Sequence, residues 1–188
     1  MMKLLKPKRL SRSIIYESSW VNLYADKVEF PAGRIIDRHH IIDFHRGAVA
    51  VIVENNNNEI LLVHAYRYPL DSIEWEIPTG GMDDGESPLE SSYREVLEES
   101  GYETSDHQLL YSFNPINGIS DLYHHVVLCR ANDCNGTFDE NEIESIKWVS
   151  VDDVKKMIKD RTMKDGLTLA AVLLYLMVKD IPEMDNKK

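Results

Sequence analysis

The segment that most constrains this chain runs from residue 80 to residue 102 and reads GGMDDGESPLESSYREVLEESGY. Ser87, Pro88 and Glu90 form a helix-start signature, with serine as the N-cap, proline at the first helical position and glutamate placed to close a capping box. Apolar residues then recur at helical spacing as far as Gly101, a residue type at which helices commonly stop. The segment therefore predicts a loop followed by one amphipathic helix.

Strand patterns lie on both sides of this helix, and four consecutive asparagines read as a hairpin turn. The expected strands cover residues 20–24, 28–30, 35–44, 48–53, 60–63, 109–113, 123–129 and 146–149. Two further helices are expected, from about residue 152 to 160 and from 167 to 178. Strands before and after a central helix, with another helix at the end, predict an α/β fold with three α/β/α layers.

The two ends of the chain give no sign of a membrane or export segment. Residues 1–13 are basic and are expected to form a flexible arm, and residues 181–188 a C-terminal tail. The only apolar pair in the arm is Leu4 and Leu5, which is too short for a signal peptide. The most apolar stretch, 167–178, is well short of the roughly 20 residues that cross a bilayer. We therefore expect a protein that does not associate with membranes.

Cysteine use points to a reducing compartment. Cys129 and Cys134 cannot build a multi-disulfide framework, and no second pair accompanies them for a structural zinc site. Reduced thiols in a cytoplasmic protein are the expectation that follows.

Charge narrows the choice of partner. The 188 residues carry 21 Lys and Arg against 32 Asp and Glu, a formal net charge of −11. Such a surplus argues against a nucleic acid partner, because backbone phosphates are bound through Lys and Arg. Residues 80–102 hold seven acidic residues and one arginine, so this segment alone has a net charge of −6.

Three of these acids share one helix face, because Glu95, Glu98 and Glu99 stand at i, i+3 and i+4. Like charges at this spacing destabilise a helix, and Arg94 alone cannot neutralise three of them. A divalent cation can, and oxygen-only ligands favour a hard ion such as Mg²⁺ or Mn²⁺. The alternative is a solvated acidic face with no ligand.

The spacing favours the metal interpretation. The pattern is Gly80-x5-Glu86-x7-Arg94-Glu95-Val96-x-Glu98-Glu99-x-Gly101-Tyr102. It resembles the signature of the Nudix hydrolases, with Tyr102 where that family usually has an aliphatic residue. The segments 64–69 (HAYRYP), 74–80 (EWEIPTG) and 168–171 (TLAA) are similar to the ADP-ribose pyrophosphatase branch, and the resemblance covers roughly residues 14–180.

The resemblance implies a Nudix-type α/β/α sandwich with a mixed β-sheet in residues 45–180. It also implies an N-terminal antiparallel β segment in residues 14–44 that acts as a dimerisation element, so a homodimer is expected. The implied activity is metal-dependent hydrolysis of the diphosphate in a nucleoside diphosphate linked to a second group. ADP-ribose, giving AMP and ribose 5-phosphate, is the first choice of substrate, and other nucleotide sugars are the second.

The same resemblance assigns roles to individual residues. Metal ligands would be Glu95, Glu99, Glu98 and the backbone carbonyl of Thr79 or Gly80. The catalytic group would comprise Glu98, Glu99, Arg94 and Glu86, with Glu86 paired to Arg94 so that the loop is braced against the helix. Substrate contacts would come from Arg67, Gly80 and Gly81, with Glu76 beside them and Gly85 permitting the tight loop. For Arg67 the alternative is a surface ion pair.

One loop departs from the pattern of the branch, which commonly reads Ser-Pro-Gly and then Asp-Glu. Here Asn117 stands in place of the proline and Leu122 in place of the glutamate that acts on water or metal. A leucine can do neither, so Asp121, Glu98 or an acid within residues 139–144 is the candidate replacement. The departure keeps two alternatives open, a nucleotide-sugar binding or sensor module without turnover, and a hydrolase of modified nucleoside triphosphates.

The two histidines that follow this loop have no assigned role. His124 and His125 are neighbours on an expected strand, and adjacent strand residues point to opposite faces. Only one of them is therefore expected to face a substrate site.

Overall fold

The computed structural model describes residues 5–180 of the chain. They fall into two compact units, one formed by residues up to 47 together with 114–123, the other by residues 48–113 together with 124 onward. The expected tail at 181–188 and the first four residues of the expected arm lie outside the described residues. Segment 114–123, which the sequence assigned to the second unit, groups with the first.

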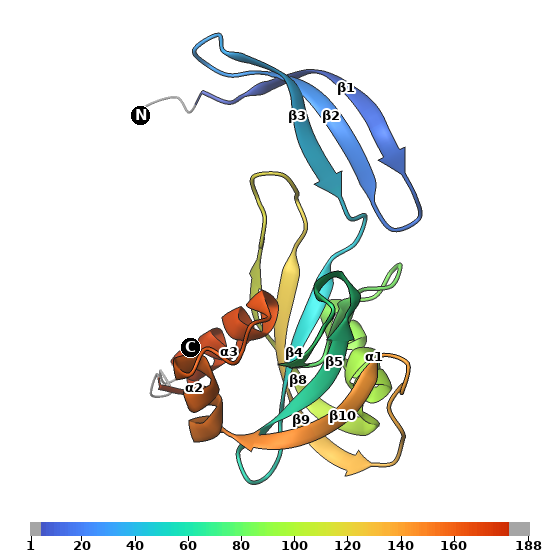
Figure 1. Ribbon diagram of the computed structural model, residues 1–188, viewed down its shortest axis with the longest axis vertical. Coiled ribbons are helices and arrows are strands. Elements are labelled where there is room, and N and C mark those ends of the chain that lie inside the picture. Colours follow the sequence, from blue (N-terminus) through green and yellow to red (C-terminus); the bar gives the residue numbers. More distant parts are fainter. Residues whose placement is uncertain (1–4, 181–188) are drawn as a thin grey trace, which may run out of the picture. The chain divides into compact units, whose positions relative to one another are not determined.

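The first unit contains a three-stranded antiparallel sheet in the order β1-β2-β3 (Figure 1). Its strands are β1 (Lys8–Glu17), β2 (Asn22–Glu29) and β3 (Ile35–Asp43). The expected flexible arm is wrong from Lys8 onward, because Lys8 to Glu17 pair with β2 along its length. All ten side chains of β1 are exposed, so the strand carries no burial pattern that the sequence could reveal.

The two short strands predicted at 20–24 and 28–30 are one strand, β2. Trp20 lies before it, in the turn from β1, and its side chain is 81% exposed. A bidentate ion pair ties β1 to β2, with Arg12 Nε and Nη2 at 2.7 and 2.8 Å from the carboxylate of Asp26. Segment 114–123 joins this unit through a backbone hydrogen bond from Ile42 N–H to Ile119 C=O.

The second unit is built on a seven-stranded mixed sheet. Its main path runs β10-β5-β4-β9-β8, while β6 pairs with β5 and β7 pairs with β4. The strands are β4 (Ala48–Glu54), β5 (Glu59–Arg67), β6 (Ser72–Glu76), β7 (Thr79–Gly81), β8 (Tyr102–Phe113), β9 (His124–Cys134) and β10 (Ile143–Ser150). The β4–β9 pair is parallel and the other pairs are antiparallel, so the predicted mixed sheet is confirmed.

Helices cover both faces of this sheet, which confirms the predicted α/β/α layers (Figure 1). They are α1 (Pro88–Ser100), α2 (Val151–Lys159) and α3 (Gly166–Asp180), with a short 3-10 turn, η1 (Tyr68–Leu70), between β5 and β6. Alternate residues of β4 serve the two faces. Val49, Val51 and Val53 pack with Val96 of α1, whereas Ala50 and Ile52 pack with the buried residues of α2 and α3.

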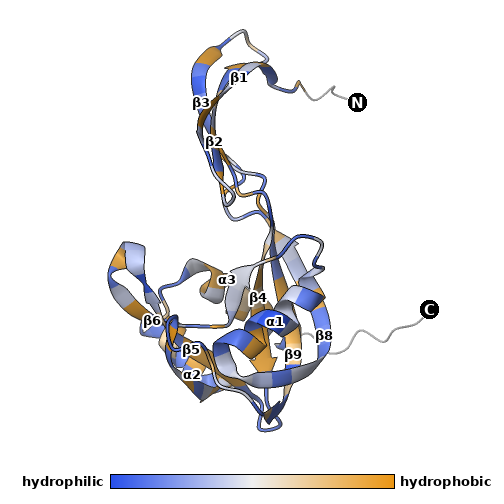
Figure 2. Ribbon diagram, turned by 90° about the vertical axis from the view of Figure 1, so that its right-hand side faces the viewer, coloured by the Kyte–Doolittle hydropathy of each residue, from blue (hydrophilic) through white to orange (hydrophobic). Residues whose placement is uncertain are grey.

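Because β4 is buried on both sides, it reads as a continuous apolar run and colours as hydrophobic in Figure 2. The turn between β4 and β5 contains Asn58, which adopts a left-handed φ of 58°. Asparagine tolerates this conformation, so the residue type suits the turn. β8 begins at Tyr102, seven residues before the predicted start at 109, and Asp106 with a φ of 56° interrupts its alternation.

The apolar C-terminal helix packs with one face only. Ala171, Val172 and Tyr175 are buried in the core under the sheet, whereas Met177 and Val178 are exposed. Among the described residues, no helix is both long and apolar enough to cross a membrane. Only one face of this apolar helix therefore lies in the interior.

Candidate active site

Local sequence fixes the two ends of α1, the helix that carries the acidic residues. Ser87 Oγ accepts from the Glu90 N–H, and the Glu90 carboxylate accepts from the Ser87 N–H at 2.8 Å, so the predicted capping box is present. Gly101 ends the helix with a left-handed φ of 72°, and its N–H donates to Leu97 C=O. A Cβ atom at Gly101 would also lie 2.6 Å from the carbonyl oxygen of Gly136. Both the left-handed backbone conformation and this close contact therefore require glycine at this position.

Arg94 clamps the loop before the helix to the helix itself. Its Nε and Nη2 donate to the two carboxylate oxygens of Glu86 at 2.9 Å, and Nη2 also donates to Gly81 C=O at 2.9 Å. Its Nη1 donates to Glu95 Oε1 at 2.8 Å and Glu98 Oε2 at 3.2 Å. Hydrogen bonds from Arg94 lower the pKa of Glu86 to about 2. The pairing of Glu86 with Arg94 is thus present as predicted.

Glu99, in the last turn of α1, has a raised pKa, in contrast to the lowered pKa of Glu86. Its side chain is 7% exposed, and its Oε2 accepts a hydrogen bond from the Thr79 N–H at 3.1 Å. Burial, aided by the negative charges of Glu95 and Glu142, raises the pKa of Glu99 to about 8, although the Thr79 hydrogen bond and the charge of Arg67 act against it. Thr79 was predicted to act through its carbonyl, and its observed contact is through the N–H.

Glu95 is held by close packing against the glycine loop. A Cβ atom built on Gly80 would lie 2.1 Å from the carboxylate of Glu95, so that no side chain fits at this position while Glu95 stays in place. Gly81 has open space around the same point. Burial raises the pKa of Glu95, although Arg94 opposes the shift. Gly80 therefore serves the site by leaving room for Glu95.

The acidic face of α1 lines a pocket of about 450 Å³. The residues around it are Glu95, Glu98, Glu99, Thr137, Phe138, Asp139, Glu142 and Ile143. Five of these eight residues are acidic, and two of the acids come from the loop before β10 that the sequence offered as one source of a missing carboxylate. Thr137 and Phe138 were not predicted, since neither residue type carries a functional signal in the sequence.

Arg67 and Glu76 form a second charged pair in this unit. Arg67 ends β5 and Glu76 ends the neighbouring β6, and the Arg67 Nε lies 3.0 and 3.1 Å from the two carboxylate oxygens of Glu76. Glu76 is 2% exposed, and its hydrogen bonds raise the pKa of Arg67 above the ordinary value. The structure brings these two predicted residues together as an ion pair, so a contact between Arg67 and a phosphate stays a prediction.

His124 and His125 lie on opposite faces of the sheet, as adjacent residues of a strand do. His124 is 6% exposed, and its Nδ1 has no hydrogen-bond partner among the described residues. His125 instead bonds through its Nδ1 with Ser112 Oγ at 2.8 Å. Leu122 and Asp121, from the departing loop, belong to the first unit rather than to the unit that holds the acidic pocket.

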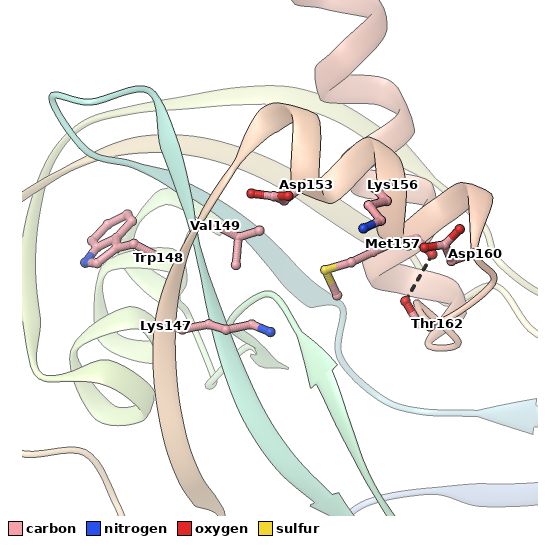
Figure 3. Close-up of a pocket in the computed structure, with 8 residues that line it drawn as sticks. All are labelled: Lys147, Trp148, Val149, Asp153, Lys156, Met157, Asp160 and Thr162. Atoms are coloured by element: carbon pink, nitrogen blue, oxygen red, sulfur yellow. Dashed lines mark hydrogen bonds between the residues drawn. The ribbon is translucent and has the colours of Figure 1, made fainter.

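A second pocket of about 380 Å³ lies between β10 and α2 and is shown in Figure 3. It contains two lysines, Lys147 and Lys156, together with Asp153 and Asp160, so its charges balance. It contains none of the residues predicted to act in a site. The acidic pocket beside α1 is therefore the candidate active site.

The donors at the acidic pocket suit a hard divalent cation, because all of its charged groups are carboxylates. Within residues 5–180, however, no three His, Cys, Asp or Glu side chains are already arranged to hold one metal ion. Arg94 accounts for part of this, since it engages Glu95 and Glu98. The residue types fit a metal, and a cation would have to compete with Arg94 for two of them.

Comparison with known proteins bears on the family and the fold. The NUDIX domain family matches residues 44–169. The methanol dehydrogenase activator of Bacillus methanolicus is 33% identical over 96% of this chain and 97% of that protein. The ADP-ribose pyrophosphatase of Bacillus subtilis (strain 168) is 31% identical over 95% and 97%. A crystal structure of an ADP compounds hydrolase shares the fold, with a TM-score of 0.84 at 19% identity over 95% and 96% of the two chains.

Proposed function

This chain belongs to the NUDIX domain family, and on that basis we propose that it is a metal-dependent hydrolase of nucleoside diphosphates linked to a second group. The bond cleaved is the diphosphate, and the first-choice substrate is ADP-ribose, with AMP and ribose 5-phosphate as products. Support for this substrate comes from the relative in Bacillus subtilis that is an ADP-ribose pyrophosphatase. Other nucleotide sugars are the second choice.

The observation that carries the proposal is the state of Glu99. A glutamate whose pKa lies near 8 at the end of a capped helix is costly to keep charged in the free protein. A bound cation would reverse that cost, because it stabilises the ionised form of each carboxylate that contacts it. Glu99 has this property in a pocket that holds four more acids, so we propose that the cation binds there.

The chemistry that the cation supplies is charge compensation of the diphosphate and a lower pKa for a bound water. We propose Mg²⁺ or Mn²⁺, held by Glu95, Glu98, Glu99 and the carbonyl of Thr79. The chain's own residues then have distinct tasks in the proposal. Arg94 and Glu86 keep the glycine loop in place, Gly80 leaves room for Glu95, and Arg67 with Glu76 offers a guanidinium for a substrate phosphate.

We also propose a homodimer, formed through the three-stranded sheet of the first unit. Its support is the number of large apolar side chains that the described unit leaves exposed, notably Ile14, Tyr16 and Ile35, each 48–59% exposed. A cytoplasmic location is proposed because Cys129 and Cys134 are both free thiols.

The test is a panel of substrates incubated with the full chain and either Mg²⁺ or Mn²⁺, with products identified by chromatography. The panel contains ADP-ribose, other nucleotide sugars, dinucleoside polyphosphates and nucleoside triphosphates. Release of a nucleoside monophosphate from ADP-ribose supports the proposal. Turnover of triphosphates alone would replace the substrate class, and thermal stabilisation by ADP-ribose without any product would instead identify a sensor module.

A further inference from the structure

The linker between β6 and β7, residues 77–78, joins two charged contacts of the second unit. On one side of it, Glu76 ends β6 and pairs with Arg67. On the other side, Thr79 begins β7 and donates its N–H to Glu99 Oε2 at 3.1 Å. Because only two residues separate these contacts, a shift of the linker moves both of them. The linker therefore controls the alignment of a guanidinium and of a carboxylate together.

Each backbone polar group of the linker has a hydrogen-bond partner. The Ile77 N–H donates to Thr168 Oγ1 at 3.2 Å, and the Ile77 C=O accepts from Thr79 Oγ1 at 3.0 Å. Pro78 has no N–H, and its C=O accepts from the Val51 N–H at 2.8 Å. Thr79 and Val51 belong to strands of the sheet, whereas Thr168 belongs to α3. The hydroxyl of Thr168 is thus the contact by which a helix holds the linker.

Thr168 is itself held firmly, in the first turn of α3. Its side chain is completely buried, and its N–H donates to Asp165 Oδ2 at 2.6 Å. The Leu169 N–H donates to the Asp165 C=O at 3.0 Å, so Asp165 caps the start of the helix from just before it. The buried residues of α3 that follow pack in one core cluster with Ile77. The hydroxyl is therefore fixed by a cap on one side and by the core on the other.

Thr168 serves the opposite face of the sheet from the acidic pocket. Ile77 packs with the buried residues of α3, whereas α1 packs on the other face, and Thr168 does not line the pocket. The start of α3 lies near one of the two charged contacts, since the charge of Asp165 adds to the rise in the pKa of Arg67 that hydrogen bonding to Glu76 mainly causes. An effect of Thr168 on the pocket therefore has to pass through the linker.

We propose that Thr168 is a positioning residue of the hydrolase, whose hydroxyl oxygen orients the linker through the Ile77 N–H. The inference rests on the proposed function. The linker in turn sets the contact of Thr79 with Glu99 and the ion pair at the end of β6. Without the hydroxyl, the buried Ile77 N–H is left unpaired and the linker shifts to satisfy it. Misplacement of a reacting group by about 1 Å can lower a rate by roughly a hundredfold, so a small shift is enough.

The test compares T168V with T168S in the full chain. Valine keeps the branched shape and lacks the hydroxyl, whereas serine keeps the hydroxyl and lacks the methyl. With ADP-ribose and Mg²⁺, or the panel substrate that the wild type cleaves fastest, T168V should lower kcat/KM by about tenfold or more, and T168S by less than about threefold. Mn²⁺ affinity, followed by electron paramagnetic resonance, should weaken in T168V alone. The Ile77 amide, followed by hydrogen exchange, should exchange faster in T168V than in T168S.

T104V is the matched control for the loss of a buried hydroxyl. Thr104 is buried on β8, and its Oγ1 lies 2.9 Å from His107 Nε2. The variant should melt at a lower temperature than the wild type, yet keep kcat/KM within about threefold and Mn²⁺ affinity unchanged, because its partner is outside the linker. All kinetics are measured at a temperature at which the melting curve of each variant shows the folded state.

If T168V does not fold, Asp165 provides a second pair of variants at a residue that is only partly buried. D165A removes the acceptor of the Thr168 N–H together with a charge, whereas D165N removes the charge and keeps an acceptor oxygen. D165A should have about threefold lower kcat/KM than D165N and weaker Mn²⁺ binding. Equal values for these two variants would overturn the inference.

Three results with the threonine variants would also overturn it. The first is a T168V variant that keeps both kcat/KM and Mn²⁺ affinity. The second is an equal loss in T168V and T168S, which would assign the effect to packing of the methyl group. The third is a loss in T104V as large as that in T168V, which would assign it to stability in general. A wild type that turns over no member of the panel overturns the proposed function itself, whereas wild-type turnover that T168V retains overturns only this inference.

Discussion

Glu86 and Glu99 belong to the same short segment of sequence but lie in opposite electrostatic environments. Glu86, in the loop before α1, is held by two hydrogen bonds from Arg94, and its pKa falls to about 2. Glu99, in the last turn of α1, is buried with one backbone N–H as a partner, and its pKa rises to about 8. The first carboxylate has its cation within the fold, and the second does not.

This difference in pKa indicates that the two ends of segment 80–102 have different roles. The end of the segment that contains Glu86 is a structural clamp, complete as the chain folds. The end that contains Glu99 has a carboxylate whose ionised form burial disfavours, which is the property expected of a group that binds a ligand. Breaking the clamp should therefore reduce stability, and changing Glu99 should reduce activity.

The largest effect is expected for Glu99→Gln. Loss of a carboxylate proposed to hold the cation should lower kcat by roughly a thousandfold, while the thermal midpoint stays at or above that of the wild type because a buried acid is removed. Kinetics with Mg²⁺ and a melting curve without metal measure the two quantities. Glu103→Gln, an exposed acid just beyond the helix, is the control. An active E99Q variant would contradict the assignment.

Arg94→Met should act mainly on stability. The variant removes the hydrogen bonds that Arg94 donates to Glu86 and Glu95, and we expect the free energy of unfolding to fall by about 2 kcal/mol. Urea denaturation of the metal-free protein measures this. Lys155→Met removes an exposed ion pair with Asp152 and should change stability by less than about 0.5 kcal/mol. Equal effects of the two changes would show that the clamp is no more than a surface contact.

Gly80→Ala tests the position of Glu95 with a smaller change. The added methyl would occupy space 2.1 Å from the Glu95 carboxylate, which must move, so we expect about a tenfold loss of kcat/KM and weaker Mn²⁺ binding. Stability should change little, because the group displaced is the end of a flexible side chain. Gly81→Ala has open space and should behave as the wild type. Identical kinetics for the two variants would contradict this role for Gly80.

Measured per pH unit, the smallest effect is expected in the pH dependence of stability of the metal-free protein. Since the pKa of Glu99 is about 8 in the fold and near 4.5 in the unfolded chain, the folded state holds the extra proton between these values. Stability should therefore fall as pH rises from about 5 to 8, by about 1 kcal/mol per pH unit. E99Q should remove this slope, and urea titrations at several pH values measure it.

Glu86 should show the opposite sign. Its pKa is lower in the fold than in the unfolded chain, so its stabilising contribution is present above about pH 4.5 and is lost as pH falls through about 2. Comparing E86Q with E99Q over pH 3 to 8 should thus give stability differences that change in opposite directions. Parallel curves would contradict the contrast between the two carboxylates.

Much of α1 could be predicted from the sequence because its determinants are local. The capping box of Ser87 and Glu90, the stop at Gly101 and the shared face of Glu95 and Glu99 depend on residues a few positions apart. The pairing of Arg94 with Glu86 followed from the resemblance of the spacing to a known signature. The three layers likewise followed from the order of strand and helix patterns, whereas the mixed sheet followed from the resemblance, and both are confirmed.

Other features depended on contacts that a local pattern cannot encode. The sequence alone determined a capped helix with an acidic face. Only the tertiary structure decided that Lys8–Glu17 forms a strand, because its exposed side chains show no periodicity and its partner strand supplies the order. Only the tertiary structure brought Glu142 to the pocket, because its place depends on a loop attached to Glu98 and Gly101 from far along the chain. The pKa values of Glu86 and Glu99 diverge for the same reason, since burial and hydrogen-bond partners arise only when distant segments pack together.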